Sequence, residues 1–145
     1  MDEPEGAIPL SEMVCWNLYQ ASRAVVAEYR RLLEPIGLSY PQYIALACLW
    51  EYGDHTVGAL ADRLQLEYGT MTPLLKRLEA AGLLTRLRDT EDERRVRVAL
   101  TTEGRMLKTQ ARRVPGCILQ ATHSDLAEVA SLTRQIQALR DRLVA

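Results

Sequence analysis

The middle of the chain carries two neighbouring stretches with apolar residues at helical spacing. In the second stretch one face is apolar, at Met71, Leu74, Leu75, Leu78 and Ala81. The first stretch has the same pattern, at Val57, Leu60, Ala61 and Leu64. Such spacing predicts two short helices that each pack one side against a core. Only the segment from Gln65 to Glu67 separates them, so the pattern predicts a helix-turn-helix.

Residues at the ends of these stretches support the predicted helices. Thr56 precedes the first helix and is a residue type that caps helix N-termini. Pro73 is expected in the first turn of the second helix, where a missing backbone N–H is tolerated, and Gly82 is expected to end that helix. Beyond Gly82, residues 83–88 and 96–100 roughly alternate between apolar and polar, which predicts two strands joined by a loop. A helix-turn-helix followed by such a hairpin is a winged helix-turn-helix.

Polar residues lie on the side of the second predicted helix away from its apolar stripe. They are Thr70, Thr72, Lys76 and Arg77, and the hairpin loop adds Arg94 and Arg95. Such side chains suit phosphate oxygens and base edges of the major groove, and an arginine on a thin loop suits a narrow minor groove. Each of these residues taken singly also fits a solvated surface. Their order along helix, turn, helix and hairpin favours DNA binding.

Long helices are predicted on both sides of this unit. Residues 10–34 have no interior Gly or Pro and repeat a seam every three or four positions, at Cys15, Tyr19, Ser22, Val26, Tyr29 and Leu33. The last segment carries a similar narrow stripe, at Leu126, Val129, Leu132, Ile136, Leu139 and Leu143. No core remains in the sequence to cover these stripes, so we expect both helices to pack against a second copy of the chain. Antiparallel pairing of the two helices within one chain is the alternative.

Two further helices connect these parts. The stretch from Tyr43 to Trp50 is apolar nearly all round and predicts a central core helix with Cys48 buried in it. Thr101 or Thr102 is expected to cap a helix that Pro115 and Gly116 then kink or break. The predicted fold is mainly α with a small β-hairpin wing, in one chain of residues 1–145. About residues 40–113 form the winged helix-turn-helix, and about 10–34 and 114–145 are dimerisation helices.

Composition narrows the classes of function. The chain has 145 residues, 48% of them hydrophobic, which is enough for one domain with a core, and it lacks an apolar run long enough to span a membrane. The segment Met1 to Gly6 is acidic and lacks the pattern of a secretory signal, so the expected compartment is the cytoplasm. Three scattered cysteines and the two histidines show no metal-ligand spacing, so neither a metal nor another cofactor is expected. His55 is expected to be a solvated turn residue.

The net charge of −1 is unusual for a DNA-binding protein, so its distribution matters more than its sum. Residues 1–62 carry 3 Lys or Arg against 9 Asp or Glu, whereas residues 63–113 carry 12 against 7. The segment with the predicted second helix and wing therefore has a net charge of +5. This distribution is compatible with DNA binding and argues against indiscriminate binding to polyanions.

Four blocks of the sequence resemble the MarR family of dimeric winged-helix regulators. They are residues 38–43 (LSYPQY), 56–60 (TVGAL), 69–79 (GTMTPLLKRLE) and 92–96 (DERRV). Together with residues 15–19 (CWNLY), they more narrowly resemble the organic hydroperoxide resistance regulators, over roughly residues 10–113. The resemblance implies a repressor that binds a pseudo-palindromic operator in double-stranded DNA as a homodimer. It also adds Gly69, Pro73 and Asp92 to the expected DNA-binding residues.

The same resemblance implies roles for two cysteines and two tyrosines. Cys15 is implied to be oxidised by organic hydroperoxides and thereby to release the DNA. Two tyrosines of the partner subunit, matching Tyr29 and Tyr40, are implied to hydrogen-bond Cys15. Some regulators of this kind resolve the oxidised cysteine with a C-terminal cysteine of the other subunit, and Cys117 is a candidate for that role. Cys117 also fits an inert buried cysteine, and Cys15 also fits plain core packing.

The positions of these residues limit the geometry. Cys15 and Tyr29 are fourteen residues apart on one predicted helix, which is on the order of 21 Å at 1.5 Å per residue. They cannot touch within one chain, so a Tyr29 that contacts Cys15 has to come from the partner. Only Tyr19, one turn along, is close to Cys15 in its own chain. A hydroxyl donor beside a cysteine favours the thiolate, which is the form that attacks a peroxide.

Three classes of function remain open on the sequence. The first is a repressor that senses organic hydroperoxides through Cys15. The second is a winged-helix regulator that responds to a small aromatic ligand at the dimer junction, with Cys15 incidental. The third is a thiol peroxidase, which the DNA-binding pattern disfavours, so an enzyme is not expected.

Overall fold

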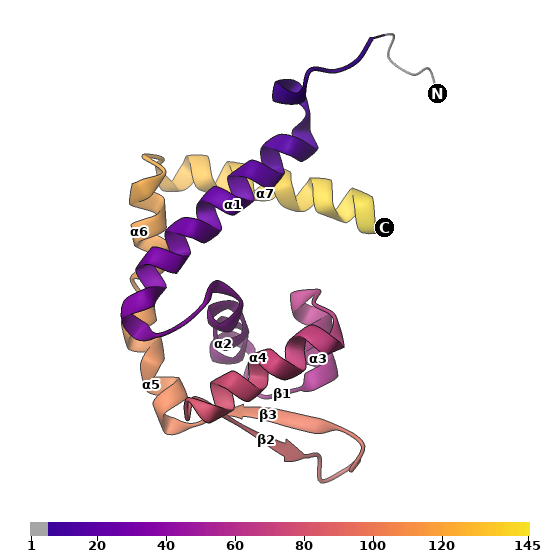
Figure 1. Ribbon diagram of the computed structural model, residues 1–145, viewed down its shortest axis with the longest axis vertical. Coiled ribbons are helices and arrows are strands. Elements are labelled where there is room, and N and C mark those ends of the chain that lie inside the picture. Colours follow the sequence, from indigo (N-terminus) through magenta and orange to yellow (C-terminus); the bar gives the residue numbers. More distant parts are fainter. Residues whose placement is uncertain (1–5) are drawn as a thin grey trace.

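The computed structural model describes residues 6–145 and is mostly helical with one small sheet (Figure 1). The acidic leader before Gly6 lies outside the described residues. The elements in chain order are a 3-10 turn (Leu10–Glu12), α1 (Val14–Leu33), a second 3-10 turn (Glu34–Ile36), α2 (Tyr40–Tyr52), β1 (His55–Thr56), α3 (Val57–Leu64), α4 (Tyr68–Ala80), β2 (Leu84–Arg88), β3 (Val96–Leu100), α5 (Thr102–Ala111), α6 (Val114–Ala121) and α7 (Leu126–Val144). The predicted fold class, mainly α with a β-hairpin wing, is confirmed.

One hydrophobic core holds α2, α3, α4 and the sheet together. Its fully buried side chains are Leu33, Leu46, Leu49, Leu60, Met71, Leu75, Leu78, Leu84 and Val98. α2 is apolar nearly all round because it lies in the middle of this core, as its sequence predicted. Cys48 is buried there, and burial raises the pKa of its thiol. The core position predicted for Cys48 is therefore confirmed.

The sheet contains the predicted hairpin and a third strand that the sequence did not indicate. β2 and β3 pair antiparallel, with Leu84 opposite Leu100 and Arg88 opposite Val96. β1 pairs with the other edge of β3, so the strand order is β1-β3-β2. Because β1 has only two residues, it is too short to show a periodic pattern in the sequence.

His55 was expected to be a solvated turn residue, and this expectation is wrong. It is 9% exposed rather than solvated, because β1 brings it under α3. Its Nδ1 lies 2.7 Å from the carbonyl oxygen of Gly53, and Arg63 Nε donates to its Nε2 at 3.1 Å. Both ring nitrogens of a buried imidazole need partners. Since Nε2 accepts from Arg63, the proton lies on Nδ1 and is donated to Gly53.

The helix ends agree with the sequence in two places and differ in one. The Thr56 hydroxyl accepts from the N–H of Ala59 at 3.1 Å, and Gly82 has φ of 77° directly beyond α4, as expected. The placement of Pro73 in the first turn is wrong. α4 begins at Tyr68, so Pro73 is its sixth residue and lies in the second turn. The carbonyl of Gly69 loses its helical donor there, at an exposed helix start where water can replace it.

The outer helices leave apolar surface uncovered. α5 ends at Ala111 and α6 begins at Val114, so the helix is interrupted just before Pro115. α1 packs against α6 and crosses α7 in Figure 1. None of the side chains of α7 is buried, and Ile136 remains 42% exposed. A groove of about 440 Å³ between α1 and α7 has apolar walls, lined in part by Val14, Leu18, Leu132, Ile136 and Leu139.

Residues 6–145 bear on membrane association and on metal binding. No helix in this part of the chain is both long and apolar enough to cross a membrane. The same residues contain no group of three or more His, Cys, Asp or Glu side chains placed to hold a metal ion.

Candidate functional site

α4 presents the predicted DNA-binding residues on its exposed side. Its apolar face packs into the core through Met71, Leu74, Leu75 and Leu78. The exposed residues of the predicted set are Gly69, Thr70, Pro73, Lys76 and Arg77, whereas Thr72 is half-buried. The Thr72 hydroxyl donates to the carbonyl of Tyr68 at 3.4 Å. The structure thus gathers the set on one helix, while its contact with DNA stays a prediction.

Asp92 organises the loop between β2 and β3. Its Oδ1 accepts from the backbone N–H of Arg94 at 3.0 Å and from Arg94 Nε at 3.1 Å, and its Oδ2 lies 3.7 Å from Arg95 Nε. The hydrogen bonds from the Arg94 side chain and backbone hold the pKa of Asp92 below its usual value. The Arg94 side chain is 90% exposed. The predicted wing residues therefore form one structured loop that carries Arg94 toward solvent.

Glu79 and Arg86 connect α4 to this wing, and no pattern in the sequence predicted that the two residues pair. The Glu79 carboxylate accepts from the backbone N–H of Arg86 at 2.9 Å and from its guanidinium at 3.1 Å. These two hydrogen bonds hold the pKa of Glu79 below its usual value. One side chain at the end of α4 therefore binds both the backbone and the side chain of β2. This contact sets the position of the wing relative to α4.

Cys15 lies in the first turn of α1 and is exposed. Tyr19, its expected neighbour, instead stacks on Trp16 with ring centroids 6.0 Å apart, and the Arg23 guanidinium lies 5.6 Å above the Tyr19 ring. Cys15 is not part of the protomer's hydrophobic core. Tyr29, on the same helix, is on the order of 21 Å from Cys15, so a Tyr29 that supports the Cys15 thiolate has to come from another chain.

Tyr29 and Tyr40 meet where α1 joins α2. Ser39 and Gln42 form reciprocal hydrogen bonds that start α2 at Tyr40. This places the ring of Tyr40 4.9 Å from that of Tyr29, centroid to centroid. Burial is the main cause that raises the pKa of Tyr29 to about 12, with smaller contributions from Tyr43 and Tyr40. The Tyr29 hydroxyl therefore keeps its proton at neutral pH and is available as a hydrogen-bond donor.

Cys117 is half-buried on α6, beside the C-terminal half of α1. The pKa of Arg31 is raised mainly by its hydrogen bond to Glu28 and to a smaller extent by Cys117, so the thiol lies near Arg31. Arg31 is sixteen residues from Cys15 on α1, which is on the order of 24 Å along the helix. A disulfide needs Cα atoms within about 7 Å. Cys15 and Cys117 of one protomer are therefore too far apart to form one.

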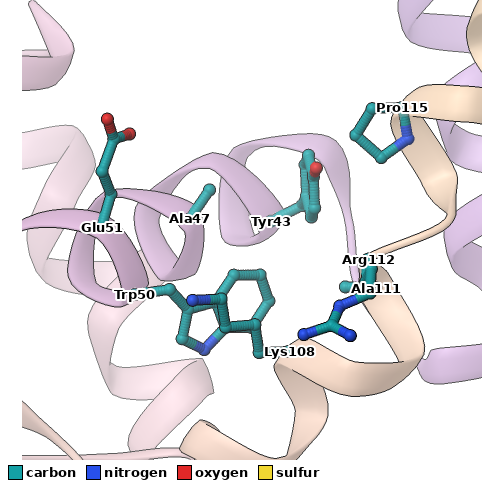
Figure 2. A pocket seen from close by; sticks show the side chains of 8 residues that line it. All are labelled: Tyr43, Ala47, Trp50, Glu51, Lys108, Ala111, Arg112 and Pro115. Carbon is teal, nitrogen blue, oxygen red and sulfur yellow. The ribbon is translucent and has the colours of Figure 1, made fainter.

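A cavity of about 290 Å³ lies between α2 and α5, next to the tyrosines. Figure 2 shows Tyr43, Ala47 and Trp50 on α2, with Lys108 and Arg112 on the opposite side. The Trp50 indole N–H donates to the carbonyl of Gly104 at 2.8 Å. The sequence placed Tyr43 and Trp50 in the core helix without a functional role. Their cavity depends on the packing of α5 against α2, which no local pattern predicts.

Comparisons with known proteins agree with this geometry. The model of the MarR family matches residues 38–96, from just before α2 to the start of β3. The organic hydroperoxide resistance transcriptional regulator of Bacillus subtilis is 40% identical to the chain over 134 residues, which are 92% of this chain and 91% of that relative. The chain belongs to the MarR family of transcriptional regulators. The family match begins after Cys15 and ends before Cys117, so it bears on the helix-turn-helix and wing rather than on these cysteines.

Solved structures support the fold of this MarR-family chain and differ in redox state. Reduced AbfR of Staphylococcus epidermidis bound to DNA superposes with a TM-score of 0.77 at 27% identity, covering 94% of this chain and 95% of that one. Disulfide-formed AbfR superposes with a TM-score of 0.67 at 29% identity, covering 92% and 89%. Overoxidised AbfR bound to DNA superposes with a TM-score of 0.76 at 27% identity, so the chain is more similar in shape to both DNA-bound structures than to the disulfide form.

Proposed function

We propose that this MarR-family regulator is a cytoplasmic repressor that releases its operator when organic hydroperoxides oxidise Cys15. One observation carries the proposal. An exposed cysteine begins α1, and a half-buried pair of tyrosine rings, Tyr29 and Tyr40, lies at its other end. The similarity to the Bacillus subtilis hydroperoxide resistance regulator supports organic hydroperoxides as the signal.

The DNA-binding half of the proposal rests on α4 and the wing. α4 offers Thr70, Lys76 and Arg77 to the major groove, and the wing offers Arg94 to the adjacent minor groove. AbfR, a structural neighbour, has been solved bound to DNA in its reduced form. Phosphate contacts from the cations set affinity, and contacts of the threonines and arginines with base edges set sequence preference. The operator is double-stranded DNA, pseudo-palindromic because the protein is two-fold symmetric.

The homodimer uses the surfaces that one protomer leaves open. A second copy is the occupant of the groove between α1 and α7, because the groove is apolar and α7 buries none of its side chains in its own chain. When two α1 helices cross antiparallel, Cys15 of one protomer comes near the other end of the partner's helix. That end carries the tyrosine pair, so each sensor site is completed by the partner.

The sensing chemistry needs only the cysteine and hydroxyl donors. A protonated tyrosine hydroxyl donates to the Cys15 thiolate and stabilises it. The sulfur then attacks the terminal oxygen of the hydroperoxide, the O–O bond breaks, and the alkoxide leaves and takes up a proton to become an alcohol. The product on the protein is a sulfenic acid. It is larger and more polar than the thiol and disturbs the tyrosine contacts.

Operator binding before and after oxidation tests the proposal. Fluorescence anisotropy with operator DNA is measured before and after a few equivalents of cumene hydroperoxide. The wild type is expected to lose affinity, whereas Cys15→Ser keeps the dimer and DNA binding and does not respond, because no sulfenic acid forms. Cys48→Ala is the matched control, since it removes a buried thiol and should respond like the wild type. If Cys15→Ser still releases DNA, the sensor is another residue.

We further propose that Cys117 of the partner resolves the sulfenic acid. The Cys117 thiolate attacks the Cys15 sulfur, the S–O bond breaks as the disulfide forms, and the hydroxide that leaves takes up a proton to become water. Such a bridge has to join two protomers, because the two cysteines of one chain are far apart along α1. AbfR has been solved in a disulfide form.

A non-reducing gel after peroxide treatment tests this step. A covalent dimer is expected from the wild type and from Cys48→Ala, and none from Cys117→Ser. Monomer in all three proteins would mean that Cys15 acts alone or is capped by a small thiol. Peroxide consumption should stop near one equivalent per sensor site, whereas continued turnover would indicate a peroxidase.

The cavity between α2 and α5 favours a second candidate, a regulator that binds a small aromatic acid. Its walls are Tyr43 and Trp50, and Lys108 and Arg112 stand at its rim. Aromatic walls suit a flat ring, and two cations suit a carboxylate. A thiol-blocking reagent that leaves regulation intact would favour this candidate over the redox repressor.

A further inference from the structure

Trp50 joins two helices, α2 and α5. It lies on α2, its indole N–H donates to the carbonyl of Gly104 at 2.8 Å, and Gly104 is in the first turn of α5. A carbonyl in a helix already accepts from the residue four positions on, so Trp50 supplies a second, tertiary hydrogen bond. This bond joins α2 to the start of α5 across more than fifty positions of sequence.

The start of α5 is in turn pressed against the end of α4. A Cβ atom added to Gly104 would lie 1.9 Å from the carbonyl oxygen of Leu83, so no side chain fits between the two backbones. Thr101 reinforces the contact, because its N–H donates to Leu83 at 3.1 Å and its hydroxyl donates to the carbonyl of Gly82 at 2.6 Å. Leu83 is bound back to α4 through Leu78 at 3.0 Å. A shift of Gly104 is therefore passed directly to the end of α4.

On its other side Trp50 continues a row of aromatic rings. The edge of Trp50 meets Tyr43 with centroids 6.3 Å apart, and Tyr43 lies 5.6 Å from Tyr29. Tyr29 contacts Tyr40 at 4.9 Å, so the row ends at the proposed sensor tyrosines. Tyr43 and Trp50 also line the cavity of about 290 Å³, which leaves space beside both rings (Figure 2). Close-packed cores resist movement, whereas rings beside a void can change rotamer.

We infer that Trp50 is the positioning residue that transmits the state of the sensor site to α4. This inference rests on the proposed function, since it assumes that oxidation of Cys15 displaces the tyrosines. In the reduced protein Trp50 holds Gly104, and through it the end of α4, in the DNA-binding arrangement. When the tyrosines move, Tyr43 turns toward the cavity, Trp50 follows, and its hydrogen bond to Gly104 is lost. Two discrete arrangements of one side chain thereby link the two sites.

Trp50→Phe tests this role because it keeps an aromatic ring and removes the N–H donor. Because its hydrogen bond to Gly104 is already absent, the reduced variant is expected to bind the operator about 5- to 10-fold more weakly than the reduced wild type, whereas Cys15 should still be oxidised at the wild-type rate, followed by mass spectrometry. The loss of operator affinity on oxidation should fall by about 5- to 10-fold, which is in the range of allosteric couplings. Tyr52→Phe, also on α2 but outside the row, is the matched control and should release DNA normally.

A second variant distinguishes the proposed role of Trp50 from a general loss of stability. Tyr43→Leu breaks the row one link earlier and should show the same defect, and the double variant should be no worse than either single one, because both act on one path. A merely structural role would lower the melting temperature and weaken DNA binding equally in both redox states. If Trp50→Phe loses operator affinity on oxidation to the same extent as the wild type, the inference is wrong, while redox sensing by Cys15 is unaffected. If the oxidised wild type itself keeps its DNA, the proposed function fails first.

Discussion

At the scale of single residues, a local partner decides where each candidate functional side chain points. Asp92 binds both the backbone and the side chain of Arg94, so the wing tip has a defined arginine rather than a mobile one. Arg94 remains 90% exposed in this arrangement. Its guanidinium therefore loses little when it exchanges water for a minor groove. The negative potential of a narrow groove attracts it there.

We expect Arg94→Ala to weaken operator binding by about 1–3 kcal/mol and to lower specificity where the wing reads groove width. The fold should persist, because the removed side chain is exposed. Anisotropy at several salt concentrations measures both the affinity and the number of phosphates contacted. The control is Arg134→Ala on α7, which removes one cation on the side of that helix opposite its apolar stripe. Equal affinities for the wild type and Arg94→Ala at moderate salt would refute the wing assignment.

At the scale of elements, α4 and the wing act together because Glu79 joins them. One carboxylate accepts from the N–H and the guanidinium of Arg86, at 2.9 and 3.1 Å. β1 pairs only with Arg97 and Val98 of β3, so the rest of the wing is a two-stranded ribbon, and such ribbons are only marginally stable alone. The distance between major-groove and minor-groove contacts is therefore set by this pair as much as by the strands.

We expect Glu79→Gln to lower the melting temperature and to weaken operator binding through a misplaced wing. The folded protein depresses the pKa of Glu79 below 4.5, so the carboxylate stabilises the fold above that pH. The stabilisation is lost as pH falls through the lower, folded-state pKa. The difference in melting temperature between wild type and variant should therefore be full at pH 7 and disappear in acid below 4.5. Glu91→Gln, an exposed residue of the wing loop, should show no such difference at any pH.

At the scale of the whole molecule, one protomer is incomplete. The winged unit has its own core, whereas α1 and α7 border an apolar groove that no side chain of residues 6–145 fills. The proposed sensor has the same property, because Cys15 and the tyrosine pair lie at opposite ends of α1. In the proposed dimer, the second copy both covers the groove and completes the sensor.

We expect Ile136→Glu to give a monomer at micromolar concentration, because it places a charge in the apolar groove between α1 and α7. Glutamate is a good helix former, so α7 itself should persist. Analytical ultracentrifugation measures the mass, and anisotropy should show weaker operator binding, since each half-site is then bound separately. Arg134→Glu on the opposite side of α7 is the matched control. A dimeric Ile136→Glu would place the interface elsewhere.

The sequence by itself determined the order of the helices and the hairpin, because these depend on local patterns. Apolar spacing, the Thr56 cap and Gly82 beyond α4 each act within a few residues. Local patterns of polar residues also predicted the candidate DNA-binding residues on α4 and the loop. The sequence also separated Cys15 from Tyr29, since helix rise alone sets that distance. The error at Pro73 was local too, because this residue lies in the second turn of the helix that begins at Tyr68 and not in its first.

Only the tertiary structure decided the contacts between residues distant in sequence. The pairing of β1 with β3 buried His55, although its neighbours in the chain suggest an open turn. The Glu79–Arg86 pair and the Trp50–Gly104 hydrogen bond join separate elements, and neither leaves a periodic trace in the sequence. Such contacts exist because helices and strands pack at specific angles and distances, which depend on all their side chains at once. A periodic pattern shows which face of an element is buried, and the packing determines which partner covers that face.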